Sequence, residues 1–471
     1  MSIVRATTPI SEELERIPVG KFHRRVLVLL GSGMVIDAFD IFLQSAVLAS
    51  MVAIGFATAG GEANFLFATF LGLAVGSVLS GALTDVFGRR FMYQINLLIF
   101  GIAAIVAAFV PTLTWVITLR FIMGIGLGGE VVTGYAALTE FIPANSRGRW
   151  AMWLGFITNL GQPLAAFVGL LVLPTLGWRW MFIIGGVPAL IVWYFRRRLP
   201  ESPRWLERRG RTDEAQAVVQ SIVQENGSVQ GVGSASIAKR TTSTVALPHL
   251  SWTVLFAPRL IRRTIFGFLI TGLILAAQYG FLTWVPTLLL KSGVSIIHSL
   301  AYSALMAIGA PVGMLIAVFT LDRLGRRWMI MGSAFLSTIF GVAYAFALHA
   351  PAVVIVLLGF VLVLLMQICA NVIVAAYLPE IFPTDVRGTG AGASVAFGRV
   401  AAALMPFLVV AVLTGAGPQA VFLLVAGMLL ILVILVAVLG EETRKRTLED
   451  ISKVAYKQET AVPVADASSA G

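Results

Sequence analysis

The chain has 471 residues, of which 58% are hydrophobic and 12% charged, and its formal net charge is +11. An average soluble protein carries roughly 25% charged residues and could not hide this much apolar surface. The composition therefore excludes a cytosolic enzyme, a disordered protein, a collagen-like fibre and a disulfide scaffold. Long continuous apolar runs argue against an outer-membrane β-barrel, so a polytopic helical membrane protein is predicted.

About twelve apolar runs are long enough to cross the hydrocarbon core, which takes about 20 helical residues. These runs cover residues 26–50, 63–84, 91–110, 114–139, 149–173, 179–197, 263–289, 299–320, 328–348, 352–377, 389–412 and 418–439. We expect an all-α membrane protein with twelve transmembrane helices in two pseudo-symmetric six-helix bundles. The expected parts are an N-terminal segment over 1–25, bundles over 26–197 and 262–440, a linker over 198–261 and a tail over 441–471.

Before the first apolar run the chain is polar, and no cleaved targeting segment is recognised there. In the first run, Asp37 and Asp40 are expected near the middle of the bilayer, where a carboxylate costs at least about 2.5–3.5 kcal/mol. They lie at i and i+3 on one helix face, and Gln44, a candidate substrate contact, continues that face. Because two close carboxylates resist joint ionisation, the pair is typical of a proton carrier. The alternative is an ion pair that ties this span to a neighbour. Of the two, Asp40 is favoured as the coupling group.

The second and third spans are joined by the motif Asp85-Val-Phe-Gly-Arg89-Arg90, and Glu140-x-x-Pro-x-x-x-Arg147-Gly follows the fourth span. Both motifs return about 240 residues later, as Asp322-Arg-Leu-Gly-Arg326-Arg327 and Glu380-x-x-Pro-x-x-x-Arg387-Gly. Such an internal duplication is typical of secondary transporters, in which one half rocks against the other. We expect these charged residues to pair at the helix ends, either as a gate or as simple surface pairs.

The fourth span contains Arg120 and Glu130. Arg120 is a permanent cation that needs a carboxylate or water nearby, or else snorkels to the membrane surface. Glu130 is expected as a second coupling carboxylate or as the partner of Arg120. Between spans six and seven, residues 225–245 are rich in Gly, Ser and Thr and are interpreted as a flexible linker.

The later spans contain one deep arginine, Arg399, whose fork suits a carboxylate. It predicts an organic anion as substrate, with a permanent pair to Asp37 or Asp40 as the alternative. Uncharged polar groups in apolar runs are candidate substrate contacts or helix–helix ties. They are Asn159, Gln162, Gln278, Tyr279, Gln367 and Asn371. Trp284 is expected to stack on a substrate ring or to line the wall.

The distribution of charge predicts the orientation. Basic residues cluster in loops that share one side if there are twelve spans, with Arg179 and Lys291 as the main exceptions. Because positive loops stay inside, both termini and the linker are expected in the cytoplasm. A count of eleven or thirteen spans would break this alternation.

On these motifs the chain resembles the major facilitator superfamily over residues 20–450, with GALTDVFGRR at 81–90 and RFIMGIGLGGE at 120–130. PESPRWL at 200–206 and the two Glu-x-x-Pro-x-x-x-Arg-Gly motifs resemble its sugar-porter branch. Within that branch the chain most resembles bacterial inner-membrane metabolite carriers, and less closely the nicotinate and aromatic-acid proton symporters. Span seven, ITGLILAAQYGFLTWVP, lacks the hexose-carrier pattern. The resemblance implies a cytoplasmic gate at the paired motifs and a role for Arg120 in modulating protonation of the span-one aspartates.

We therefore expect a secondary active transporter of a bacterial inner membrane that moves an organic acid or a sugar-acid or polyol-like metabolite, in symport with protons. The alternatives are an uncoupled facilitator of sugars or aromatic acids, and a transporter-like membrane sensor. No P-loop pattern, metal-ligand spacing or cofactor motif is recognised, so no enzyme activity, metal or cofactor is expected. The expected partners are the small-molecule substrate, protons and the lipid bilayer. No nucleic acid is expected, and the chain is expected to act as a monomer.

Overall fold

The computed structural model describes residues 10–226, 252–258, 260–383 and 386–443. All regular secondary structure in these ranges is helical. The N-terminal half contains α2 (Lys21–Ala53), α3 (Ala59–Phe87), α4 (Arg89–Ala107), α5 (Leu113–Phe141), α6 (Ala144–Asn159), α7 (Gly161–Leu176) and α8 (Trp178–Arg196). The C-terminal half contains α11 (Ile261–Leu282), α12 (Val285–Lys291), α13 (Ile296–Ala307), α14 (Gly309–Leu324), α15 (Arg326–Phe346), α16 (Ala352–Asn371), α17 (Leu378–Ile381) and α18 (Arg387–Leu439).

The helices account for twelve membrane passes. Among the described residues, 11 helical segments are long and apolar enough to cross a bilayer. The last of them, α18, is two passes joined at Gly417, whose φ of 81° breaks the helix. The α6–α7 and α13–α14 pairs each form one pass, as do α16 and α17 with the π-helical turn Val372–Tyr377 between them. The structure thus confirms the expected fold class.

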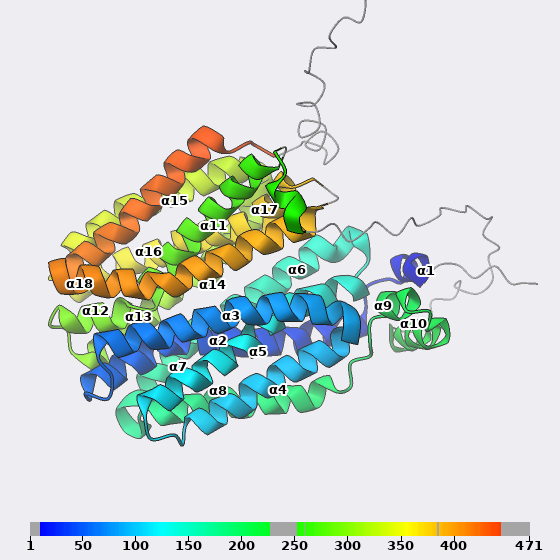
Figure 1. Ribbon diagram of the computed structural model, residues 1–471, viewed down its shortest axis with the longest axis horizontal. Coiled ribbons are helices and arrows are strands. Elements are labelled where there is room, and N and C mark those ends of the chain that lie inside the picture. Colours follow the sequence, from blue (N-terminus) through cyan, green and yellow to red (C-terminus); the bar gives the residue numbers. More distant parts are fainter. Residues whose placement is uncertain (1–9, 227–251, 259, 384–385, 444–471) are drawn as a thin grey trace, which may run out of the picture.

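The two halves form separate helix bundles that meet along several helices (Figure 1). The main contacts between the halves are α3 with α18, α7 with α13, α2 with α12 and α6 with α14. Within the N-terminal half, α3 and α5 approach closely because glycines face the opposing backbone. A Cβ on Gly76 would lie 2.0 Å from the carbonyl oxygen of Ile125, and one on Gly128 would lie 2.1 Å from that of Leu73.

Three short helices lie at one end of the N-terminal half (Figure 1). They are α1 (Ile10–Arg16), α9 (Pro203–Arg208) and α10 (Thr212–Asn226), and they contact one another and, through α10, α2. We call this end of the molecule the linker face and the other end the opposite face. Most of the stretch interpreted as a flexible linker, residues 227–251, lies outside the described residues. The part of the linker region before it is helical.

At the linker face, tight turns join α3 to α4 and α14 to α15. Gly88 and Gly325 occupy these turns with φ of 93° and 90°, a conformation that glycine adopts without steric cost. Each turn places an arginine pair, Arg89-Arg90 or Arg326-Arg327, at the start of the next helix. The repeated sequence motif is therefore a repeated turn geometry.

Candidate functional site

A buried ion pair lies in the middle of the N-terminal half. The Arg120 guanidinium on α5 donates from Nη1 to both carboxylate oxygens of Asp40 on α2, at 2.9 and 2.8 Å. Its Nη2 donates to Gln44 Oε1 at 3.2 Å and its Nε to Thr69 Oγ1 at 3.3 Å. The Phe65 ring lies 5.0 Å from the guanidinium carbon, so every side of this cation is occupied. Arg120 and Asp40 are both fully buried.

These contacts settle several expectations. Arg120 neither snorkels nor pairs with Glu130, because its carboxylate partner is Asp40. Gln44, expected at the substrate, uses its oxygen to accept from Arg120, and its amide nitrogen has no partner. The same pairing means that Asp40, the carboxylate favoured for coupling, already has a permanent counter-charge.

A second buried ion pair lies nearer the linker face. Glu130 on α5 accepts from Arg196 Nη1 at the end of α8. Arg196 also donates to the carbonyl oxygens of Leu29 and Leu30 on α2, each at 2.8 Å. Arg196 is fully buried, although sequence reasoning did not single it out. It is the first of three consecutive arginines, at the end of the predicted span over 179–197 and next to the basic linker. Its place at the span end was the only available signal.

Asp37 lies between these two ion pairs, and within the described part of the chain it has neither a hydrogen bond nor a salt bridge. Both of its carboxyl oxygens are buried without a partner, and the side chain is 1% exposed. Glu130, Arg196 and Asp40 are the charged groups whose fields act on it. Because α2 presents residues i and i+3 on one face, Asp37 and Asp40 point the same way, as the sequence predicted.

Where the halves meet, amide side chains form a chain of hydrogen bonds. Gln278 on α11 donates to Gln367 on α16, and Gln367 donates to Asn159 on α6. Asn159 and Asn371 each also donate to a carbonyl oxygen of their own helix, four residues back. The structure therefore brings Asn159, Gln278 and Gln367 together, while Asn371 bonds within its own span.

Arg399 on α18 faces the N-terminal half from the other side of this contact. Its Nη1 donates to the carbonyl oxygen of Leu73 on α3 at 3.0 Å. No salt bridge to Arg399 occurs among the described residues, so the alternative of a permanent pair with Asp37 or Asp40 is wrong. Its charge acts on the Tyr279 hydroxyl, and the Tyr279 ring lies 4.5 Å from that of Phe70 and 6.3 Å from that of Phe42.

A small cavity between the halves contains Gln162 in its wall. About 30 Å³ of it is accessible to water, room for about two molecules, and it is lined by Phe42, Ser45 and Phe281 among others. The Gln162 amide oxygen is buried without a partner. Trp284, the other candidate, is fully buried and its indole N–H is unpaired. Trp284 therefore belongs to the packed wall of the C-terminal half.

At the opposite face, one hydrogen bond links the two halves through a residue that sequence reasoning missed. Thr287 Oγ1 on α12 donates to Glu62 Oε1 on α3 at 2.9 Å, and both side chains are at most 1% exposed. The second oxygen of Glu62 has no partner. Glu62 lies just outside the apolar run predicted for span two, so its sequence position resembled a loop.

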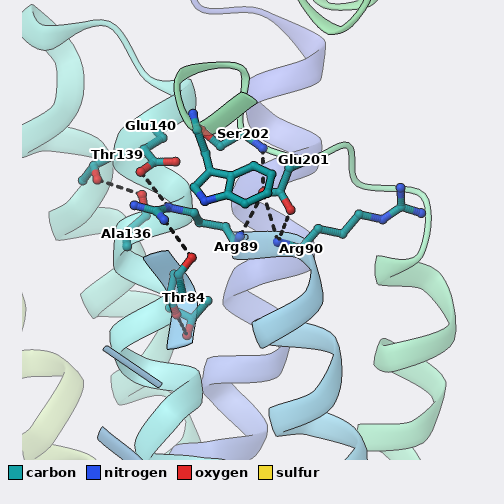
Figure 2. A network of polar contacts seen from close by, with 10 residues as sticks. Thr84, Arg89, Arg90, Ala136, Thr139, Glu140, Glu201 and Ser202 are labelled. Carbon is teal, nitrogen blue, oxygen red and sulfur yellow. Dashed lines mark hydrogen bonds and ion pairs between the residues drawn. The ribbon is translucent and has the colours of Figure 1, made fainter. Parts of the chain in front are cut away.

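At the linker face, the motif residues of the N-terminal half form a network within that half (Figure 2). Arg89 donates from Nε to Glu140 at 2.8 Å and from Nη1 to the carbonyl oxygen of Thr84 at 2.9 Å. Glu201 accepts from the backbone N–H groups of Arg89, Arg90 and Ser202. Burial raises the pKa of the Glu201 carboxyl, and these N–H donors act in the opposite direction.

The C-terminal half repeats the network. Arg326 donates to Glu380 at 3.1 Å, and Glu442 accepts from the backbone N–H groups of Arg326 and Arg327. The terminal nitrogens of Arg90 and Arg327 both donate to a carbonyl oxygen, of Arg197 and Ala437 respectively.

The other motif residues are Arg147, Arg387, Asp85 and Asp322. Arg147 departs from the expected network, because it donates to Glu15 in α1 at 2.9 Å. Arg387 begins α18. The side chains of Asp85 and Asp322 lie outside the described residues.

Comparisons with known proteins fit this architecture. Residues 33–455 match the family model described as sugar (and other) transporter. The inner membrane metabolite transport protein YdjE of Escherichia coli is 34% identical over 94% of this chain and 98% of its own. The niacin transporter NiaP of Acinetobacter baylyi is 33% identical over 93% of this chain and 98% of its own. A partially occluded inward-open structure of the E. coli xylose transporter XylE has a TM-score of 0.71 at 19% identity. The structural match covers 90% of this chain and 99% of the XylE chain.

Proposed function

The chain belongs to the sugar (and other) transporter family of the major facilitator superfamily, and from this premise we propose that it couples a small organic anion to protons. It is a multi-pass membrane transporter of small metabolites, not an enzyme. The identity of the substrate class, the coupling and the roles of individual residues are the proposal. Its basis is an imbalance of buried charge in the N-terminal half.

The imbalance lies in the middle of that half. Three carboxyl groups, Asp37, Asp40 and Glu130, are at most 1% exposed, and two guanidinium groups lie beside them. Arg120 neutralises Asp40, and Arg196 neutralises Glu130. An ionised Asp37 would leave one uncompensated charge in an apolar interior, which costs several kcal/mol. We therefore assign Asp37 as the group that carries the transported proton.

The pair Asp40–Arg120 is assigned a supporting role. It lies one helical turn from Asp37 and fixes that part of α2 against α5. When the carrier opens to either side and water reaches α2, Asp37 releases or takes up its proton. Loss of the Asp37 proton changes the charge balance around Arg120 and Arg196. That change favours one arrangement of the halves over the other, which is how a proton drives alternating access.

Arg399 is assigned as the anion site. It is a half-buried cation without a carboxylate partner in the described part of the chain, and it contacts the other half. Tyr279, Phe70 and the amides of Gln278 and Gln367 supply an aromatic wall and donors near the same contact. Niacin, which the relative NiaP is named for, is an aromatic monocarboxylate. A ring that bears one carboxylate is therefore the proposed substrate, with sugar acids as the second class.

The orientation follows from charge. The basic residues gather at the linker face, so we place that face and both termini in the cytoplasm. YdjE is an inner membrane protein, and we place this chain in the bacterial inner membrane too. On this orientation, Glu62 and Thr287 close the outer side. The motif networks stay within each half, and we propose that they hold the inner gate when the halves approach there.

Proteoliposome flux tests the proposal. A monoanion that moves with one proton carries no net charge, so its accumulation should follow the pH gradient and ignore a valinomycin-imposed potential. Asp37→Asn should abolish accumulation while exchange of substrate for substrate persists. Asp213→Asn, on the surface of α10, is the matched control and should behave as the wild type. Unchanged accumulation by Asp37→Asn would refute the assignment and favour an uncoupled facilitator.

The anion site has its own test. Arg399→Gln should weaken carboxylate uptake at least tenfold, because a charge-assisted contact is worth about 1.5–3 kcal/mol. Uptake of the matching uncharged amide should change less. Equal losses for acid and amide would show that Arg399 shapes the fold of the site rather than binding the carboxylate.

A further inference from the structure

A groove runs along the outer surface of the N-terminal half, between the start of α4 and the end of α8. Its volume is about 280 Å³, and its walls include Arg90, Gln94, Leu98, Trp193 and Arg197. A second cavity of about 370 Å³ shares Arg90 and Gln94 with it and extends toward α9. The transport proposal uses neither cavity.

The end of the groove nearest the linker face has two cations. Arg90 points away from the Glu140 network and toward α8, as Figure 2 shows, and its Nη2 donates to the carbonyl oxygen of Arg197 at 2.8 Å. The Arg197 guanidinium lies 3.8 Å from the centre of the Trp193 ring. Neither arginine has a salt bridge within the described ranges, so the remaining N–H groups of both are available to an anion.

The two acidic residues that line the neighbouring cavity, Glu201 and Glu214, have hydrogen-bond partners of their own. Glu201 accepts three backbone N–H groups, and Glu214 pairs with Arg211 at 2.7 Å. Among the described residues that line the groove itself, Arg90 and Arg197 are charged and none is acidic, so the groove is positively charged.

The Gln94 amide lies between the cations and the apolar part of the groove. Both polar atoms of its amide are shielded from solvent and have no hydrogen-bond partner among the residues that the structure describes. A buried amide left unpaired is destabilising, so native proteins usually satisfy such groups. A ligand with ester carbonyls in this groove would supply the missing partner.

The groove changes from polar to apolar with depth. Arg89 begins α4 and Arg196 ends α8, so Arg90 and Arg197 lie at the same membrane surface. At 1.5 Å per helical residue, Leu98 lies about 12 Å deeper than Arg90 along α4. A polar end at the surface and apolar walls below match the head group and acyl chain of a phospholipid.

From these features we propose that the α4–α8 groove is a binding site for an anionic phospholipid. The head-group phosphate accepts from Arg90 and Arg197, the ester region meets the Gln94 amide, and an acyl chain lies against Leu98 and Trp193. The site does not depend on the transport proposal.

Native mass spectrometry of the full chain with phosphatidylglycerol and phosphatidylethanolamine tests the site. We expect the wild type to retain phosphatidylglycerol in preference, and Arg197→Gln to lower its retention about tenfold. Arg198→Gln is the matched control, since Arg198 is the next residue, contacts Phe195 and does not line the groove. It should retain phosphatidylglycerol as the wild type does. Added inorganic phosphate should not displace the lipid, because phosphate lacks the acyl chain.

Three outcomes would overturn the proposal: equal retention by Arg197→Gln and Arg198→Gln, equal retention of the two lipids, or displacement by phosphate. A second variant guards against misfolding. Gln94→Leu keeps both arginines, and it should lower retention while its unfolding temperature in lipid-free detergent stays at or above that of the wild type. Wild-type retention by Gln94→Leu would exclude the amide from the site.

Discussion

The two halves of this transporter are alike at the linker face and unlike in their interiors. Arg89 with Glu140 and Glu201 is repeated by Arg326 with Glu380 and Glu442, down to the same backbone N–H groups. In the interior, the N-terminal half holds two buried ion pairs and the unpaired Asp37. Arg399 is the charged side chain that the described C-terminal half places deep in a span.

We propose that the two halves divide two tasks between them. In this proposal the paired turns and charges at the helix ends, which both bundles have, control how the bundles meet. A proton site requires a carboxyl group in an apolar interior, and one bundle is enough to hold it. On this view coupling belongs to the N-terminal half, and the C-terminal half contributes the cation that attracts the substrate.

The largest expected effect comes from removing a buried counter-charge. Arg196→Met leaves Glu130 unpaired and should cost about 3–5 kcal/mol of stability. Arg399→Met leaves no carboxylate behind and should cost far less. Unfolding in detergent would measure both. The double variant Arg196→Met/Glu130→Leu should recover most of the lost stability. Similar losses for Arg196→Met and Arg399→Met would contradict the proposed difference between the halves.

Substituting the glycines at close helix contacts tests a feature that the two halves share. Gly76 on α3 and Gly313 on α14 occupy equivalent places, and a Cβ on Gly313 would lie 2.5 Å from the carbonyl oxygen of Leu364. Gly76→Ala and Gly313→Ala should each cost about 1–3 kcal/mol, because the backbones must separate. Gly332→Ala, where a Cβ meets nothing within 4 Å, is the control and should be neutral or stabilising. Tolerance of either packing variant would mean that its helix pair is not held by close contact.

A smaller effect is expected at the contact between the halves on the opposite face. Thr287→Val removes the hydrogen bond to Glu62, worth about 0.5–1.5 kcal/mol, and should favour opening there by roughly two- to tenfold. A cysteine at Ser45, which lines the cavity between the halves, would report this opening through maleimide labelling. The native Cys369 is buried and gives a low background. Labelling that does not rise would show that apolar packing alone closes this face.

The smallest effect concerns pH at the linker face. Because burial raises the pKa of Glu201, its carboxyl binds a proton more tightly in the folded chain than in the unfolded one. The resulting stability is present below the ordinary carboxyl pKa and is lost as the pH rises through the raised value. Glu201→Gln cannot titrate, so the difference in unfolding temperature between wild type and variant should shrink or reverse as pH rises. A constant difference would contradict this.

Hydropathy and the duplicated motifs were sufficient to predict the twelve passes and a charge network that includes Arg89 and Glu140. The passes depend on apolar length, and the network depends on motif residues that lie at helix ends on the same face. The partner of Arg120 could not be predicted in this way. It depends on how α2 and α5 are rotated against each other, which the spacing of residues along either span does not specify.

Arg196 and Glu62 show a second limit of the same kind. Arg196 lies at the end of the predicted span over 179–197 and Glu62 just before the one over 63–84, where a charged residue is ordinary and gives no sign of burial. Their burial follows from neighbours far along the chain, Glu130 for one and Thr287 for the other. The roles of Asp37 and Arg399 in transport remain predictions for the experiments above.

The Arg196 guanidinium occupies space that exists because residue 33 has no side chain. A Cβ on Gly33 would lie 2.0 Å from Arg196 Nη2 and 3.0 Å from the Glu130 carboxylate. A single methyl group at this position would therefore displace a charge as well as fill a gap. For anyone engineering this carrier, Gly33 is a place where a change in volume becomes an electrostatic defect. Random mutagenesis should recover it as a coupling mutant, although it has no side chain.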